Sequence, residues 1–243
     1  MSDLLARLRR NGRKIFGAIL LLVAGGIAIL LYSGSYFDRD PFVRFPARGK
    51  VQPILVMSLS GDMGLRYGMG GVIARGLSAK GIAVSGINSP VLFRQPRTRA
   101  EVDALIADLV RRAAREAGER RLVLLGQSYG ADMLQTGLAR LPADLRERVT
   151  AIVLVVPGKT AFFRSDPSGL AYRGQPDSWG ISTARTIDWA PLTCIYGVKE
   201  TDSLCPLLKQ RNAHVVAMPG GHYLNHDDDA LTAHVFAAIR NAR

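Results

Sequence analysis

Between residue 53 and the C-terminus, short apolar segments alternate with segments of helical periodicity, and this alternation constrains the fold more than any other feature. The apolar segments are residues 53–61, 82–88, 121–127, 150–158, 192–197 and 213–221. Helical patterns occupy the intervals, most clearly at residues 66–80, 97–118, 131–141 and 227–240. Continuous apolar strands that alternate with helices are typical of parallel sheets covered on both faces. The sequence therefore predicts an α/β fold with a mostly parallel, doubly wound sheet of about six strands.

Two stretches depart from this alternation. Residues 33–52 mix Pro, Gly and charges, which indicates a linker or a loose first strand. Residues 159–190 are rich in Gly, Pro, Ser and aromatic residues, and we interpret them as a short cap or loop excursion within a domain that spans 53–243. Sheets of this kind place their functional sites at the carboxyl ends of the strands.

The N-terminal region suits a membrane. Residues 15–32 carry no charge over 18 positions, about the length that crosses the hydrocarbon core. Residues 1–14 contain five Lys or Arg and one acid, so the positive-inside bias predicts a cytoplasmic N-terminus, an inner-membrane anchor at 15–32 and a periplasmic domain. A cleaved signal peptide is the alternative, although the apolar run is longer than usual for one and the following residues form a poor cleavage site.

The chain is strongly basic, with a formal net charge of +12 in 243 residues. Such a balance favours anionic surroundings, among them phospholipid surfaces and nucleic acids. Basic motifs interleaved with aromatic residues are absent from the sequence, which makes nucleic acid the weaker interpretation. Zinc-ligand spacing is absent too, and we expect neither a metal nor a cofactor.

The segment "LLGQSYGAD" places Ser128 between a predicted strand and a predicted helix. That setting is the one in which a Gly-x-Ser-x-Gly motif forms a nucleophile elbow, the sharp turn of α/β-hydrolases. Gly126 and Gly130 supply the small residues that such a turn needs. The helix N-terminus would direct the Tyr129 amide toward an oxyanion. An ordinary serine in a glycine-flanked loop remains the alternative.

Further residues of a hydrolase site lie after other predicted strands. The loop after residues 53–61 offers the Asp62 or Met63 amide as a second oxyanion donor. His222 follows the last strand and is the expected base, since α/β-hydrolases place Ser, acid and His in that order along the chain. Asp202 is the expected acid, in the loop after residues 192–197, and Glu200 is the alternative.

Cys194 and Cys205 are the only cysteines. In an oxidising periplasm, an even pair with this spacing suggests a disulfide. Such a bond would close the loop that carries the expected acid and would hold its carboxylate in place.

The combination of these motifs resembles the bacterial AcvB/VirJ virulence-protein family. The similarity runs through "SGDMG", "GQSYGAD", "IYGVKETDSLCP" and "PGGHYL", in that order, over roughly residues 50–240. It implies a periplasmic α/β-hydrolase with Ser128, Asp202 and His222 as nucleophile, acid and base. AcvB-type members imply hydrolysis of lysyl-phosphatidylglycerol, and VirJ-type members imply secretion-system proteins as partners.

An aminoacylated phospholipid agrees with the residues themselves. An anchor and a basic surface would hold the domain near anionic lipid, and Asp62 and Asp132 are candidates to bind the ammonium group of the substrate. Asp132 has an alternative interpretation as a hydrogen-bonding residue of the helix turn. Two other functions stay open: an envelope carboxylesterase or thioesterase of different specificity, and a hydrolase-fold adaptor for type IV secretion.

Overall fold

The computed structural model describes the backbone of residues 2–241 and the side chains of residues 14–241. Its centre is a seven-stranded sheet with the order β1-β3-β2-β4-β5-β8-β9. The strands are β1 (Phe42–Phe45), β2 (Ile54–Leu59), β3 (Ala83–Ile87), β4 (Arg121–Gln127), β5 (Val149–Val155), β8 (Leu192–Gly197) and β9 (Ala213–Met218). All neighbouring strands are parallel except β1 and β3. The six predicted strands and their mostly parallel arrangement are confirmed.

Helices cover both faces of the sheet. The longer ones are α3 (Met69–Ala79), α5 (Arg99–Ala117), α6 (Tyr129–Leu138) and α9 (Asp228–Asn241). The burial of strand β4 explains why residues 122–125 are all apolar. Leu122 and Leu124 belong to the core cluster that includes α5 and α6, whereas Val123 and Leu125 belong to the cluster that includes α3 and α9. Successive side chains of a strand point to opposite faces, so a strand segment covered on both faces has apolar residues at successive positions.

Short elements complete the chain between these layers. They are α2 (Gly64–Tyr67), α4 (Ser89–Leu92), α7 (Ala143–Arg146), α8 (Gly180–Ala184), the 3₁₀ helices η1 (Leu170–Tyr172), η2 (Cys205–Leu207) and η3 (Leu224–His226), and the hairpin strands β6 (Thr160–Ala161) and β7 (Ser178–Trp179). The predicted helix at 66–80 is interrupted at Gly68, where the backbone is extended, and so forms α2 and α3.

Residues 33–52 were interpreted as a linker or a loose first strand, and β1 confirms a strand within them. Phe42–Phe45 pairs with β3 in the antiparallel direction and adds a seventh strand at the sheet edge. The Arg112 guanidinium lies 3.6 Å from the centre of the Phe42 ring, a cation–π contact that helps hold the strand. A four-residue strand among Pro, Gly and charges has too little periodicity to be distinguished from a linker by sequence, and pairing with β3 decides its structure.

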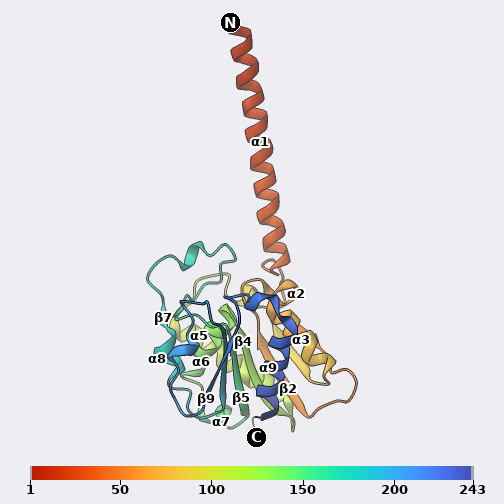
Figure 1. Cartoon of the computed structure of the whole chain (residues 1–243), viewed down its shortest axis with the longest axis vertical. Coiled ribbons are helices and arrows are strands. Elements are labelled where there is room, and N and C mark those ends of the chain that lie inside the picture. The colour runs from red at the N-terminus through yellow and green to blue at the C-terminus, as the bar shows by residue number, and fades with distance from the viewer. Residues whose placement is uncertain (1, 242–243) are drawn as a thin grey trace.

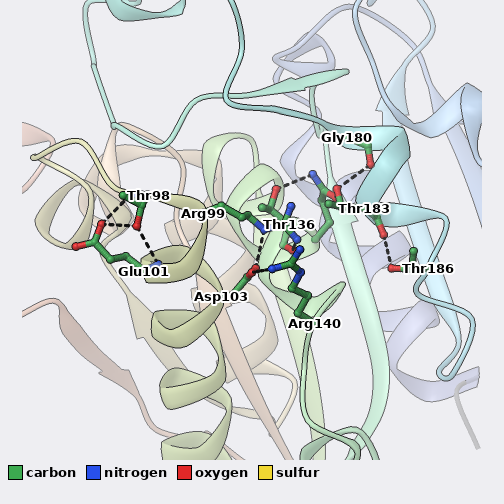
Figure 2. Close-up of polar contacts among 10 residues, drawn as sticks. Thr98, Arg99, Glu101, Asp103, Thr136, Arg140, Gly180, Thr183 and Thr186 are labelled. Carbon is green, nitrogen blue, oxygen red and sulfur yellow. Dashed lines mark hydrogen bonds and ion pairs between the residues drawn. The ribbon is translucent and has the colours of Figure 1, made fainter.

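The helix that follows Ser128 is tied to its neighbours by polar contacts (Figure 2). Arg99 of α5 donates to Asp103 at 2.8 Å and to the Thr136 carbonyl of α6 at 3.2 Å. Asp103 also lies 3.6 Å from Arg140, just beyond the end of α6. These contacts fix α6 against α5, and with it the turn that carries Ser128.

Figure 2 also shows contacts at the start of α5 and between α8 and α6. Thr98 caps α5 reciprocally: its hydroxyl accepts from the Glu101 amide while the Glu101 carboxylate accepts from the Thr98 amide. At the other side, the Thr183 hydroxyl of α8 donates to the side-chain oxygen of buried Gln135 in α6. Helix α6 is thus held from both sides.

Helix α1 (Ser2–Ser33) projects from the domain as a single long rod (Figure 1). Its part from Lys14 to Ser33 is long and apolar enough to cross a membrane, and a signal sequence would share these properties. Met1 and the side chains of residues 2–13 are outside the described part, so the basic N-terminus at 1–14 remains a prediction from sequence.

Candidate active site

Ser128 occupies a strained turn between β4 and α6. Its backbone has φ 51° and ψ −124°, a region that residues with a side chain rarely adopt. The Ser128 amide donates to the Val155 carbonyl at 2.8 Å, which holds the turn against the end of β5. Strain of this kind persists where the surroundings fix it, and it is typical of a nucleophile presented at the end of a strand.

The two glycines of the motif are required by close packing of the backbone. A Cβ atom at Gly126 would lie 2.6 Å from the Ala131 Cα, and one at Gly130 would lie 2.3 Å from the Ser60 carbonyl oxygen. Both distances are far inside van der Waals contact and involve backbone atoms that do not move easily. The Gly-x-Ser-x-Gly spacing therefore reflects the geometry of the turn.

His222 lies beside Ser128, in the loop that follows β9. Its Nε2 atom is 2.9 Å from the Ser128 Oγ. The next side chain, Tyr223, meets the imidazole edge-on, with the ring centroids 5.7 Å apart. The structure brings together the two residues that were predicted as nucleophile and base, from loops that are 94 positions apart in sequence.

Of the other three histidines, two lie away from Ser128, and His226 lines a cavity beside it. His214 and His234 line a separate cavity of about 310 Å³, which also contains Pro191 at the amino end of β8. His226 stacks on Tyr223, with the ring centroids 5.6 Å apart. Within the described part of the chain, His222 is the histidine hydrogen-bonded to Ser128.

The acid beside His222 is Glu200, and the expectation of Asp202 is corrected. Glu200 Oε1 lies 2.6 Å from His222 Nδ1, and Glu200 Oε2 accepts from the Gly197 amide at 3.2 Å. The Glu200 side chain is only 6% exposed. Asp202 is exposed, and its carboxylate makes no hydrogen bond or ion pair among the described residues.

Backbone pairing explains why Asp202 is excluded from this role. The Lys159 amide donates to the Asp202 carbonyl at 2.7 Å, and the Leu204 amide donates to the Pro157 carbonyl at 2.9 Å. These bonds fix the Asp202 backbone against the segment after β5. Glu200 comes earlier in the loop, beside the end of β8, and its longer side chain reaches the imidazole.

The predicted disulfide is present between Cys194 and Cys205, with their Cα atoms 5.4 Å apart. Cys194 lies within β8, and Cys205 begins η2 on the far side of the Glu200 loop. The bond therefore closes the loop onto the strand that it leaves. In the chain-entropy model a loop of this size contributes roughly 2.5–3 kcal/mol to folding stability.

Reduction of this disulfide should lower turnover before it unfolds the domain. A freed loop lets the Glu200 carboxylate move away from His222, and a displacement of about 1 Å can lower a rate roughly a hundredfold. The Cys194→Ser/Cys205→Ser double variant should behave like the reduced protein. Turnover of a soluble ester and far-ultraviolet circular dichroism, recorded at the same temperature, separate the two effects. Full activity after reduction of the folded protein would limit the bond to a structural role.

Three backbone amides near Ser128 have no hydrogen-bond acceptor among the described residues. Tyr129 begins α6, so its amide has no acceptor within the helix. Asp62 and Met63 lie in the turn after β2, and a Cβ at the preceding Gly61 would come within 3.3 Å of the Ser128 Cβ. Among the hydrogen bonds of the described residues, none is donated by the amide of Tyr129, Asp62 or Met63. All three stay available as oxyanion donors.

The Asp62 side chain connects this loop to the cap. Its Oδ1 accepts hydrogen bonds from the Ser165 hydroxyl at 2.8 Å and from the Tyr172 hydroxyl at 2.7 Å. Burial raises the pKa of Asp62 to about 6, against the lowering effect of these hydrogen bonds. Asp62 thus fixes residues 162–177 over the site, a contact that the sequence did not indicate.

A pocket of about 360 Å³ opens beside Ser128 and His222. Its lining residues are Asp62, Ser128, Tyr129, Asp132, Val156, Gly158, Thr160, Phe162, Tyr172, Glu200, Asp202 and His222. Four of these are carboxylates, and no described lining residue is Lys or Arg.

Val156 has φ 47°, which for a β-branched residue is an outlier and places a second strained backbone beside the nucleophile.

Asp132 lies in the wall of this pocket, one turn into α6. Its Oδ1 accepts from the Gly158 amide at 2.8 Å. Burial raises the pKa of Asp132 well above its usual range, and nearby carboxylates raise it further although the Gly158 amide opposes them. Tyr129 places a buried hydroxyl in the same wall, and this group has no hydrogen-bond partner in the described structure.

Solved structures share this arrangement of the chain. Est1E from Butyrivibrio proteoclasticus superposes with a TM-score of 0.56 at 15% identity, covering 84% of this chain and 96% of that chain. An α/β serine hydrolase homologue from Coxiella burnetii gives 0.56 at 14%, with coverages of 83% and 91%. A lidless α/β serine hydrolase from Xanthomonas campestris gives 0.52 at 20%, with coverages of 84% and 90%. These likenesses establish the α/β-hydrolase fold.

Sequence comparison is more specific. Among curated proteins, no match to this chain was found. The family model described as bacterial virulence protein (VirJ) matches residues 53–243, which is the whole sheet domain except β1. The chain therefore belongs to the VirJ family of bacterial virulence proteins and carries its family region on an α/β-hydrolase fold.

Proposed function

We propose that this protein is a membrane-anchored serine hydrolase that cleaves the aminoacyl ester of aminoacyl-phosphatidylglycerol, with the lysyl ester as its preferred substrate. In the proposed reaction His222 removes the Ser128 proton as Oγ attacks the ester carbonyl. Glu200 holds the imidazole in the productive tautomer and stabilises its protonated form. The Tyr129 amide and an amide of the Asp62–Met63 turn stabilise the oxyanion.

Collapse of this intermediate breaks the ester bond and leaves an aminoacyl-serine. His222 gives its proton to the ester oxygen of the leaving group, and phosphatidylglycerol departs with a free hydroxyl. Water, activated by His222, then hydrolyses the acyl-serine and frees the amino acid. The reaction needs only the described protein groups and water.

The observation that carries the substrate proposal is the charge of the pocket. A chain with a net charge of +12 places four carboxylates around the space next to its nucleophile and no described Lys or Arg. Two of them have other contacts, because Glu200 pairs with His222 and Asp62 binds the cap. A lysyl group, with its two ammonium groups, is the kind of acyl chain that complements such a lining.

The raised pKa of Asp132 supports the same proposal. A carboxylate resists ionisation when it is buried near other carboxylates, and a cation that enters favours the ionised form. The half-buried Asp132 has no described cationic partner, so a substrate ammonium would supply one. Affinity for the lysyl substrate should therefore increase as pH rises through the raised pKa of free Asp132, and decrease below it.

Asp132→Asn should raise KM for the lysyl ester by roughly tenfold or more, since a hydrogen bond to a charged group contributes about 1.5–3 kcal/mol. The asparagine oxygen still accepts from Gly158, so the fold should persist. A neutral short-chain ester is the matched control, and its KM should change little. Equal changes in KM for both esters would contradict a role for Asp132 in charge recognition.

The activity itself is tested with purified full-length protein and vesicles that contain lysyl-phosphatidylglycerol. We expect free lysine and phosphatidylglycerol by mass spectrometry, and no products with Ser128→Ala. Equal cleavage of neutral esters or thioesters would instead indicate an envelope esterase of broad specificity. Absence of fluorophosphonate labelling at Ser128, together with no hydrolysis of any ester, would favour the adaptor function and type IV secretion partners.

The proposed location is the inner membrane, with the catalytic domain in the periplasm. Lys and Arg precede the apolar part of α1, which favours a cytoplasmic N-terminus. The Cys194–Cys205 disulfide suits an oxidising compartment. Both features agree with a substrate that resides in the membrane.

A further inference from the structure

The chain that follows α1 is packed onto the catalytic domain. Ser35 is only 2% exposed. The Tyr36 hydroxyl donates to the Arg94 carbonyl at 3.2 Å, and the Arg94 guanidinium donates to the Asp38 carbonyl at 2.6 Å. These contacts leave little freedom between the end of α1 and the domain.

The end of α1 packs against the loop after β2, which also carries the candidate oxyanion residues. A Cβ at Gly64 would lie 2.9 Å from the Gly34 carbonyl oxygen, so these two backbones touch. Gly64 follows directly after the candidate oxyanion residues Asp62 and Met63. Two residues further, the Arg66 guanidinium lies 5.3 Å from the centre of the Tyr32 ring at the end of α1.

The anchor consequently leaves the domain on the catalytic face. Figure 1 shows α1 extending away from the end of the molecule where α2 and the cap lie. Helix α7 and the C-terminus lie at the opposite end. The apolar part of α1, Lys14–Ser33, has 20 residues and spans roughly 30 Å as a helix, about the thickness of the hydrocarbon core. If α1 crosses the membrane, the catalytic face starts at the lipid headgroups.

Exposed apolar side chains lie on loops of this same face. Phe37 follows α1, Tyr67 ends α2, Leu170 lies in the cap and Tyr223 follows His222. Their exposed fractions are 58%, 68%, 60% and 63%. They come from four separate segments, and Tyr67 and Tyr223 line one cavity with Ser128 and His222. Aromatic residues with this exposure are typical of the interface between water and lipid.

Basic residues accompany these apolar ones. Arg164 and Arg173 are exposed in the cap on either side of Leu170, and Lys199 is exposed in the loop that carries Glu200. Anionic headgroups attract each such side chain. The apolar positions and the basic ones together suit a surface of anionic phospholipid.

We propose that the catalytic face is a membrane-docking surface: α1 holds it flat against an anionic bilayer, with Phe37, Leu170 and Tyr223 in the headgroup layer. A lipid ester then reaches Ser128 from the bilayer surface without crossing water. This inference rests on the proposed membrane anchorage, but it does not depend on which ester is cleaved. It would hold even for a protein without esterase activity.

Depth-dependent fluorescence quenching tests the orientation. The two native cysteines are disulfide-bonded, so a maleimide fluorophore labels only a cysteine introduced by Leu170→Cys. Asp144→Cys is the matched control, because Asp144 is exposed on α7 at the opposite end. In full-length protein reconstituted into vesicles that contain phosphatidylglycerol, spin-labelled lipids should quench the first probe at least fivefold more than the second. Equal quenching of both, or stronger quenching at Asp144, would overturn the proposal.

A functional experiment separates this inference from the proposed activity. Leu170→Glu should leave the rate of hydrolysis of a soluble short-chain ester within twofold of the unaltered protein. Leu170 does not line the pocket beside Ser128. Hydrolysis of a lipid ester in vesicles should fall about fivefold or more. Unchanged lipid hydrolysis would overturn the docking surface. No hydrolysis of any ester by the unaltered protein would overturn the proposed function, while the quenching result would still decide the orientation.

The N-terminal sequence of the mature protein tests the shared premise. Residues 2–33 should be retained in the membrane fraction, because the segment from Gly34 to Asp38 is packed into the domain. Mature protein that begins after residue 33 would overturn both the anchor and the docking surface.

Discussion

Ser128→Ala should lower kcat/KM for ester hydrolysis by roughly 10⁴- to 10⁶-fold, the range expected when the nucleophile of a triad is removed. Covalent catalysis is lost entirely, because alanine has no atom that can attack the carbonyl. The backbone amides around the site remain, and they account for the residual rate. The effect should appear in kcat rather than in KM, since the Ser128 hydroxyl acts on the reacting carbon and not on the bound acyl chain.

The fold should survive this change. Alanine retains the Cβ that Ser128 already places in the strained turn, and the hydroxyl contacts only His222 among the described side chains. We expect a change in unfolding free energy within about 1 kcal/mol, as for a substitution that opens no cavity. Ser168→Ala is the matched control, since Ser168 is exposed in the cap. A purified Ser128→Ala protein with activity within tenfold of wild type would show that the elbow assignment is wrong.

Much of the fold follows from hydrophobic patterning. Most residues of strand β4 and its neighbours are apolar because helices cover both faces, so these apolar runs are visible in the sequence. Strand β1 could not be predicted in this way. Phe42–Phe45 is an edge strand stabilised by pairing with β3 and by the Arg112 contact. Such stabilisation depends on residues that are far away in sequence.

Some residues of the candidate site could be predicted from local sequence, and others could not. Ser128 and His222 were predictable because each follows a predicted strand and lies beside glycines in the sequence. The cap contacts of Asp62 join residues 103 and 110 positions apart, and no local pattern encodes them. The acid was ambiguous because Glu200 and Asp202 lie in one short loop. Only the backbone path of that loop decides which carboxylate faces His222.

Two substitutions two positions apart test that decision. Glu200→Gln should lower kcat by about 10³- to 10⁴-fold, because an amide no longer fixes the imidazole tautomer or stabilises its positive charge. Glutamine has the same length and can still accept from the Gly197 amide, so the loop should keep its conformation. Asp202→Asn should leave kcat for a neutral soluble ester within about threefold, since its effect is confined to an exposed carboxylate.

Comparing the two variants distinguishes a carboxylate that orients His222 from one that only adds negative charge to the loop. Each removes one negative charge from the same segment, and the disulfide closes the loop in both. Of the two carboxylates, Glu200 alone lies within hydrogen-bond distance of His222 among the described contacts. A large loss of kcat with Glu200→Gln but not with Asp202→Asn would assign the acid. A large loss of kcat with Asp202→Asn and little change with Glu200→Gln would return that role to Asp202.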